Sequence, residues 1–110
     1  MKNFIQEGNV IGISAPYDVS SGDGVFLTSV FGVATNDALS GADVEIATTG
    51  VYDLAKKSTD TPAVGAKAYW DDTLKHITTT ATAMKLVGVF TTAAGNGDTS
   101  VNVRLNGVTI

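Results

Sequence analysis

The sequence predicts an all-β protein. Its 110 residues include fifteen threonines and twelve glycines. Branching at Cβ suits a pleated strand, and Gly is typical of turns. Several short runs alternate between apolar and polar residues, whereas no long stretch has the three-and-four spacing of an amphipathic helix. The only candidate helical turn lies in "LAKKSTDTPAVG", where Pro62 limits it.

The alternation is clearest in "SVNVRLN", which places Val101, Val103 and Leu105 on one face. "DVEIAT" alternates in the same way, and "KLVGVFTT" is apolar on both faces, as expected for a strand covered on both sides. Further strands are predicted in "NVIGIS", "GVFLTSVFGVAT", "AKAYWD" and "LKHITTT".

Turn signals separate these runs at intervals of about 8 to 12 residues, a spacing typical of a sandwich or a small barrel. These signals are "SSGDG" (20–24), "TNDALSGAD" (35–43), "TTG" (48–50), "VG" (64–65), "WDD" (70–72) and "AAGNGD" (93–98). A chain of this length suits one domain with one modest core.

Composition excludes several classes of protein. The chain has no cysteine, which rules out disulfides, Cys-ligated zinc and thiol catalysis. The net charge is −4 and the basic residues are scattered apart from Lys56 and Lys57, which argues against nucleic acid as a partner. No run reaches the roughly 18 apolar residues of a membrane span. Polar residues interrupt the first ten, so we expect no signal peptide and synthesis in a cytoplasm.

The stretch "VGAKAYWDD" (64–72) offers the first candidate for chemistry, a phosphate-binding loop. A Walker A loop needs two glycines five residues apart, followed by Lys and then Ser or Thr. Here one Gly precedes the Lys, and Ala68 follows it. "GNGDTS" lacks the Lys. We therefore predict no nucleotide or other cofactor.

A hydrolytic catalytic site is the second candidate, and the sequence does not support it. His76 is the only histidine, so any catalytic triad must use it. It lies within a predicted strand, where a single His is more often a packed or surface residue. Ser14 in "GISAP" has Pro16 where a nucleophile elbow needs its second Gly. The sequence predicts no catalytic residue.

Paired carboxylates are the next candidate, for a metal site. Asp71 and Asp72 are adjacent, so on a strand they would point to opposite faces. Asp23 and Asp98 lie in fragments of calcium-type loops, but neither fragment has a carboxylate at every second position. Asp and Asn are also common in turns because they bond their own backbone. We predict turn chemistry and no metal.

The aromatic residues are dispersed and form no basic-aromatic stripe for stacking bases. "VGAKAYWDD" then predicts a turn at Gly65 followed by a strand on which Tyr69 and Trp70 face opposite ways. Trp70 is a candidate interface residue because Trp is enriched at interface centres, and it is equally a candidate for the core.

Six segments in order carry a resemblance: "MKNFIQEGNVIGISAP", "SGDGVFLTSVFGVA", "VEIATTGVYDLAK", "VGAKAYWDD", "LVGVF" and "GDTSVNVRLNG". Together they resemble a family of small phage and prophage proteins, catalogued as a domain of unknown function. Members are labelled capsid cement (head decoration) protein or RecA/RadA-family phage recombinase. The resemblance covers nearly the whole chain.

The resemblance implies a β-barrel core, so we predict an all-β, small single-domain β-barrel, SH3-like or related, over residues 9–110. It also implies a homotrimer on the outer capsid surface of the virion, made in the bacterial host cytoplasm. Such a protein binds the major capsid protein of an expanded head and stabilises contacts between its subunits. It would be a structural protein and not an enzyme, with neither nucleic acid nor membrane as a partner.

Residues 1–8 are predicted to form an extended N-terminal arm, because Gly8 and Asn9 separate Phe4 and Ile5 from the first strand. Those two residues either cover the end of the domain or add to a strand edge of the capsid.

Two alternatives to the cement role remain at this point. In the first, the protein is a decoration module that binds a glycan or a host surface, with Trp70, Asp71 and Asp72 as its candidate site. In the second it is a nucleotide-dependent phage recombinase. The second alternative lacks a Walker A loop and the length of a RecA-type core.

Overall fold

A computed structural model describes residues 9–107 and 110, which form nine β-strands and no helix. The prediction of an all-β protein is confirmed. No helix in this part of the chain is long and apolar enough to cross a membrane.

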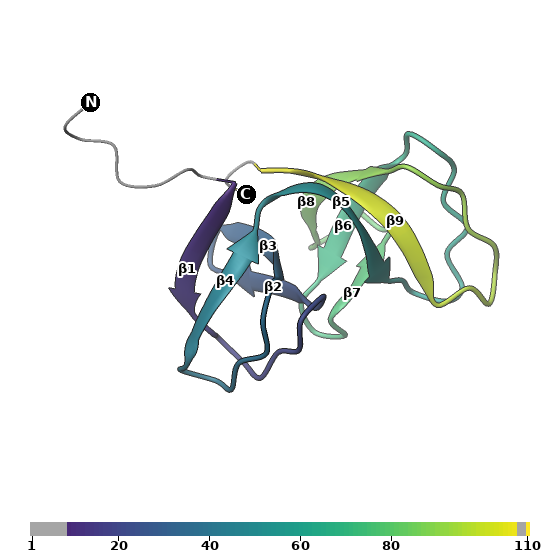
Figure 1. The fold of residues 1–110 in the computed structure, drawn as a ribbon. Helices are drawn as coiled ribbons and strands as arrows, with labels where there is room; N and C mark the ends of the chain where they lie inside the picture. The colour runs from purple at the N-terminus through teal and green to yellow at the C-terminus, as the bar shows by residue number, and fades with distance from the viewer. Residues whose placement is uncertain (1–8, 108–109) are drawn as a thin grey trace, which may run out of the picture.

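The first four strands form an antiparallel sheet of order β1-β4-β3-β2 (Figure 1). They are β1 (Val10–Ser14), β2 (Gly24–Leu27), β3 (Val30–Ala34) and β4 (Asp43–Ala47).

The other five strands form a second antiparallel sheet, of order β5-β9-β8-β6-β7, which curls beside the first (Figure 1). They are β5 (Thr49–Ala55), β6 (Lys67–Asp71), β7 (His76–Thr78), β8 (Lys85–Phe90) and β9 (Ser100–Asn106). The edge strands of this sheet meet where Lys57 N donates to Ile77 O at 2.9 Å, beside an isolated parallel bridge. No continuous ladder joins these edges, so the predicted barrel is not closed.

The chain passes from one sheet to the other without a turn. "TTG" (48–50) was expected to be a turn, and this expectation is wrong: β4 ends at Ala47 and β5 begins at Thr49. Thr48 between them is buried. Gly50, the second residue of β5, has a φ of 110°, which a residue with a side chain rarely adopts.

The segment "GVFLTSVFGVAT" was expected to form one strand, and it forms the hairpin of β2 and β3. Leu27 pairs with Val30 across a turn of two residues. Thr28 takes a φ of 55° in that turn. Gly or Asn usually occupies a turn position with positive φ, and a β-branched residue such as Thr rarely does. The sequence therefore carried no signal for this turn.

Two clusters of apolar side chains hold the sheets. The larger cluster lies between the sheets and includes Val101, Val103 and Leu105, so the face predicted for that strand is confirmed. The smaller cluster covers the other face of the first sheet and is closed by the loop after β1. Its buried members are Ala15, Val19, Val25, Ala34, Val44 and Ile46.

The candidate helical turn after Leu54 is instead a loop wrapped around a buried ammonium group. Lys56 is 4% exposed, and its Nζ donates to the carbonyl oxygens of Lys57 (2.7 Å), Ser58 (3.3 Å) and Asp60 (2.5 Å). A buried charge needs such partners because it has lost its water. The loop therefore takes its shape from Lys56.

Asp60 ties the same loop to the end of β7. Its Oδ2 accepts hydrogen bonds from Thr78 Oγ1 at 2.6 Å and Thr79 N at 2.9 Å. Burial acts to raise the pKa of Asp60, but these hydrogen bonds and the charges of Lys57 and Lys56 outweigh it. The net effect is a lowered pKa. The carboxylate is therefore held in its ionised form.

Candidate interaction surface

The stretch 64–72 forms a turn and a strand, as predicted. Gly65 has a φ of 86°, and β6 begins two residues later. Asp71 Oδ1 accepts hydrogen bonds from the backbone N–H groups of Thr73 (2.9 Å) and Leu74 (3.2 Å), in the turn between β6 and β7. This carboxylate has the turn role expected of it.

Asp72 connects that turn to the core. Its Oδ1 accepts hydrogen bonds from Trp70 Nε1 at 3.1 Å and from Lys75 Nζ at 2.8 Å. The Lys75 ammonium also lies 4.0 Å from the centre of the Tyr17 ring. The side chains of both predicted candidates, Asp71 and Asp72, are thus engaged in local structure.

Trp70, the candidate interface residue, lies in the core between the two sheets and is 3% exposed. The sequence left core and interface open, and the structure places the indole in the core. A sugar-binding platform requires an exposed aromatic face. The glycan-binding alternative therefore loses the residue on which it depended.

His76 is only partly buried and lies beside Asp71, with Nε2 3.7 Å from Oδ2. That nitrogen is shielded from solvent and makes no hydrogen bond to any described residue. Among residues 9–107 and 110, no group of three or more His, Cys, Asp or Glu side chains is close enough to hold a metal ion. The predicted arm, with Phe4 and Ile5, lies outside the described residues.

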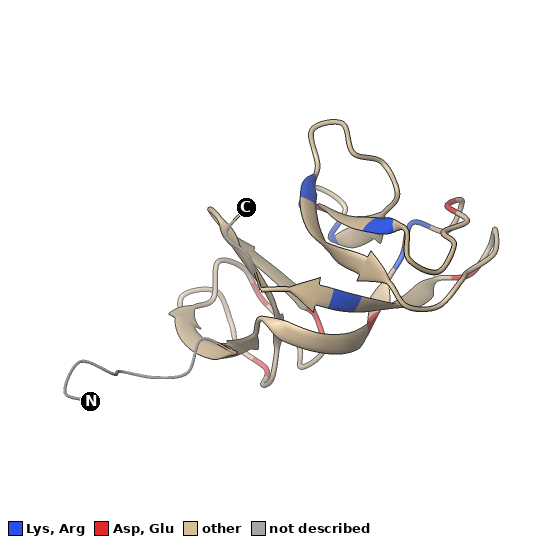
Figure 2. Cartoon of the chain, turned by 90° about the horizontal axis from the view of Figure 1, so that it is seen from above, with Lys and Arg blue, Asp and Glu red and all other residues tan. Residues whose placement is uncertain are grey.

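Charge is divided between the two halves of the molecule (Figure 2). Residues 9–48, which form the first sheet and its loops, contain five carboxylates and no Lys or Arg, a formal charge of −5. Residues 49–107 contain six Lys or Arg and five Asp, a formal charge of +1 with His76 neutral. The first sheet thus presents an acidic surface to any partner.

The outer edge of β2 is blocked by a side chain. Tyr17 Oη donates to Gly24 O at 3.0 Å and accepts from Phe26 N at 3.0 Å. Burial raises the pKa of Tyr17; the hydrogen bond from Phe26 opposes this, and the nearby Asp72 and Asp23 add to it. The phenol therefore stays protonated and able to donate, and it takes the place of a neighbouring strand.

The opposite edge of the same sheet is β1, which among the described strands pairs only with β4. Ala15 N donates to Ala42 O at 2.8 Å, and Thr48 N donates to Asn9 O at 2.8 Å. Because bonding direction alternates along an antiparallel strand, the odd-numbered residues of β1 bond to β4. The backbone groups that point away from the sheet are those of Val10, Gly12 and Ser14.

The sheet face beside this edge is uncovered. β3 residues Phe31 and Val33 cover the second sheet, and the pairing of Val33 with Ala47 places alternate residues of β4 on that same face. Further along the face, Asp43 and Glu45 are exposed. The face is therefore covered at β2, β3 and Ala47 and open around Asp43, Glu45 and the β1 residues opposite them.

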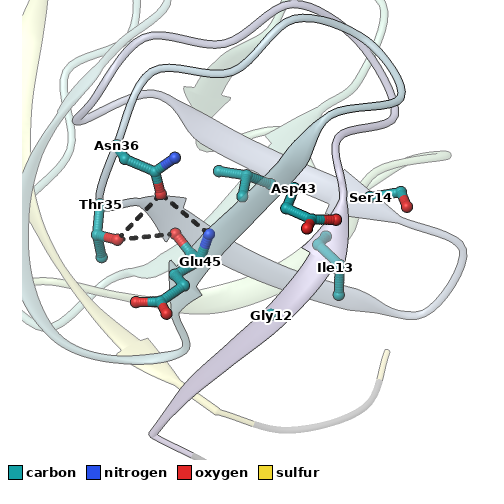
Figure 3. A pocket seen from close by; sticks show the side chains of 8 residues that line it. Gly12, Ile13, Ser14, Thr35, Asn36, Asp43 and Glu45 are labelled. Carbon is teal, nitrogen blue, oxygen red and sulfur yellow. Dashed lines mark hydrogen bonds between the residues drawn. The ribbon is translucent and has the colours of Figure 1, made fainter.

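A shallow groove of about 750 Å³ occupies this open region (Figure 3). Its acidic side chains, Asp43 and Glu45, stand opposite Ser14 and Gly12 in the ladder. Asn36 also lines the groove, and it is held against β4 because its Oδ1 accepts a hydrogen bond from Glu45 N at 3.1 Å. We refer to the β1 edge together with this groove as the acidic edge.

Sequence reasoning did not identify the acidic edge as a site. One signal for it is visible in the sequence, since no Lys or Arg occurs between Lys2 and Lys56. The free backbone groups carry no such signal, because only the order of strands decides which strand lies at an edge.

Comparison with known proteins supports the resemblance noted in the sequence. A family model for phage cement proteins matches residues 5–105 of the chain. A comparison with curated proteins found no match. Because the family model spans nearly all of the chain, including every described strand up to Leu105, the chain belongs to the phage cement protein family, whose role in the capsid is structural.

Proposed function

We propose that this protein binds the outside of an expanded phage head and stabilises the contacts between neighbouring major capsid subunits. The observation that carries this proposal is the family match over residues 5–105. The role is non-enzymatic. It requires a rigid body with surfaces that recognise protein, and the two sheets joined through one core supply such a body.

The protein is proposed to act as a homotrimer, formed either in solution or on the capsid. Capsid sites repeat many times over a shell, and a trimer engages several subunits at once. Linked contacts raise overall avidity without any new contact. Modest contacts at each subunit would therefore suffice for stable attachment.

The experiment is co-sedimentation of the purified protein with undecorated capsids of the phage that encodes it, in expanded and in unexpanded form. Saturable binding to expanded shells alone is the expected result. Equal binding to both forms would contradict recognition of the expanded lattice. A folded protein that binds neither form would contradict the capsid role itself.

The proposed N-terminal arm is tested in the same assay. Deletion of residues 2–7 is expected to weaken binding if Phe4 and Ile5 add to a strand edge of the capsid. Unchanged binding would overturn this role for the arm while leaving the cement role intact. The number of copies bound per shell, compared with the mass of the free protein, tests the trimer.

A further inference from the structure

The two edges of the first sheet differ in a way that points to a partner. At β2 two of the outward backbone groups, the Gly24 carbonyl oxygen and the Phe26 N–H, are bonded to the Tyr17 hydroxyl. At β1 the corresponding groups of Val10, Gly12 and Ser14 have no bond to any described residue. An edge strand with free donors and acceptors is a template for another strand, and proteins usually block such edges. Here one edge is blocked and the other is open.

The side chains along β1 leave room for an added strand to reach the sheet face. Gly12 lies directly opposite Glu45, and a Cβ built on Gly12 would meet no atom within 4 Å. Ser14, opposite Asp43, is the smallest polar side chain. No bulky β1 side chain therefore stands between the carboxylates of β4 and a strand added beside β1.

The distance between an added strand and the carboxylates on β4 defines which side chain of that strand could reach them. Strands lie about 4.8 Å apart, so an added strand would lie about 10 Å from β4. A Lys or Arg side chain, with its long stem, spans most of that distance across Gly12, and the Glu45 side chain covers the rest. A carboxylate here would be repelled by Asp43 and Glu45, and residues 9–48 contain no Lys or Arg to offset that repulsion.

From these observations we infer that the acidic edge binds an extended segment of a neighbouring capsid subunit by strand addition, with a Lys or Arg of that segment crossing Gly12 to pair with Glu45. The identity of the partner rests on the proposed function; the chemistry of the segment rests on the edge and its charge. Main-chain hydrogen bonds supply affinity in this mode, and alternate side chains supply specificity.

Gly12→Pro tests the backbone component, with Gly12→Ala as its matched control. Both variants add a Cβ in open space, but only Pro removes the outward N–H. Pro is tolerated on an edge strand where that N–H is free. We expect Gly12→Ala to bind expanded shells like the wild type and Gly12→Pro to bind about tenfold more weakly or worse. Equal binding by the two variants would overturn the inference.

Glu45→Lys tests the charge component. The control is Asp53→Lys on β5, which makes the same change of charge at an exposed residue of the other sheet. Weaker shell binding by Glu45→Lys alone is expected, and equal effects of the two variants would overturn the inference. If Gly12→Pro does not fold, the comparison of Glu45→Lys with Asp53→Lys tests the inference by itself. If the variants change self-association in sedimentation velocity and not shell binding, a second copy occupies the edge and the inference is wrong.

A peptide probe separates failure of this inference from failure of the proposed function. The probe is an alternating Lys-Val peptide added to the ¹⁵N-labelled wild-type protein, with an alternating Glu-Val peptide as control. Amide shifts at Val10, Gly12 and Ser14 with the Lys-Val peptide alone would support the site even if the wild type bound no shell. Absence of these shifts, or equal shifts with both peptides, would overturn it.

Discussion

The rings of Phe31 and Trp70 pack against each other at the junction of the two sheets. Their centroids are 4.9 Å apart and their planes are inclined by 49°. Phe31 comes from β3 of the first sheet and Trp70 from β6 of the second. Gly24 on β2 approaches so closely that a Cβ there would lie 2.7 Å from the indole. The two sheets therefore share one core and should unfold together.

Phe31→Ala is expected to lower the free energy of unfolding by about 3–5 kcal/mol, because it removes a buried aromatic ring and leaves a cavity. Leu39→Ala is the control, since Leu39 is 72% exposed. Urea unfolding followed by far-UV circular dichroism and by Trp70 fluorescence measures both variants. Two separate transitions in the wild type would contradict a shared core.

Gly88→Ala is expected to destabilise the protein by about 3 kcal/mol or to prevent folding, because the strands on both sides of β8 hold it in place. A Cβ on Gly88 would lie 1.9 Å from the carbonyl oxygen of Arg104 on β9. Gly12→Ala, which meets nothing within 4 Å, provides the comparison. Thermal unfolding of the two variants checks the prediction, and similar melting temperatures would refute it.

Tyr17→Phe is expected to cost about 1–2 kcal/mol and to increase association between molecules. The change removes the hydroxyl that satisfies Gly24 O and Phe26 N, so the β2 edge becomes open. Tyr69→Phe serves as the control, because the Tyr69 hydroxyl makes no hydrogen bond to the described residues. Urea unfolding and light scattering at matched concentrations measure the two effects; a stable, monodisperse Tyr17→Phe variant would count against this role.

Asp60→Asn is expected to cost roughly 1–2 kcal/mol at pH 7, because Thr78 and Thr79 donate to a charged acceptor. The pKa of Asp60 is lowered in the folded protein. Its contribution is therefore present above the unfolded pKa of about 3.9 and is lost as the pH falls through the folded pKa.

Urea unfolding at pH 7 and near pH 2.5 tests this dependence. The difference between the wild type and Asp60→Asn should be largest at pH 7 and should shrink in acid. Asp53→Asn, which removes an exposed carboxylate from β5, should show no comparable difference at pH 7. A cost of Asp60→Asn that does not change with pH would show that the charge of Asp60 contributes nothing.

Local signals in the sequence were enough to predict individual strands. The alternation of Val101, Val103 and Leu105 predicted the buried face of β9, because alternate side chains of a strand point to opposite faces. Gly65 correctly marked a turn. Thr28 did not mark one, because its positive φ is imposed by the pairing of β2 with β3 and not by its own preference.

Sequence alone determined the all-β class, the most regular strand faces, the family and the absence of basic residues between Lys2 and Lys56. Only the tertiary structure decided that Trp70 lies in the core, that the chain changes sheets at Thr48, and that β1 is a free edge beside two carboxylates. The reason is physical. Side-chain alternation is a property of one strand, whereas strand order and burial depend on which distant segments pair and pack.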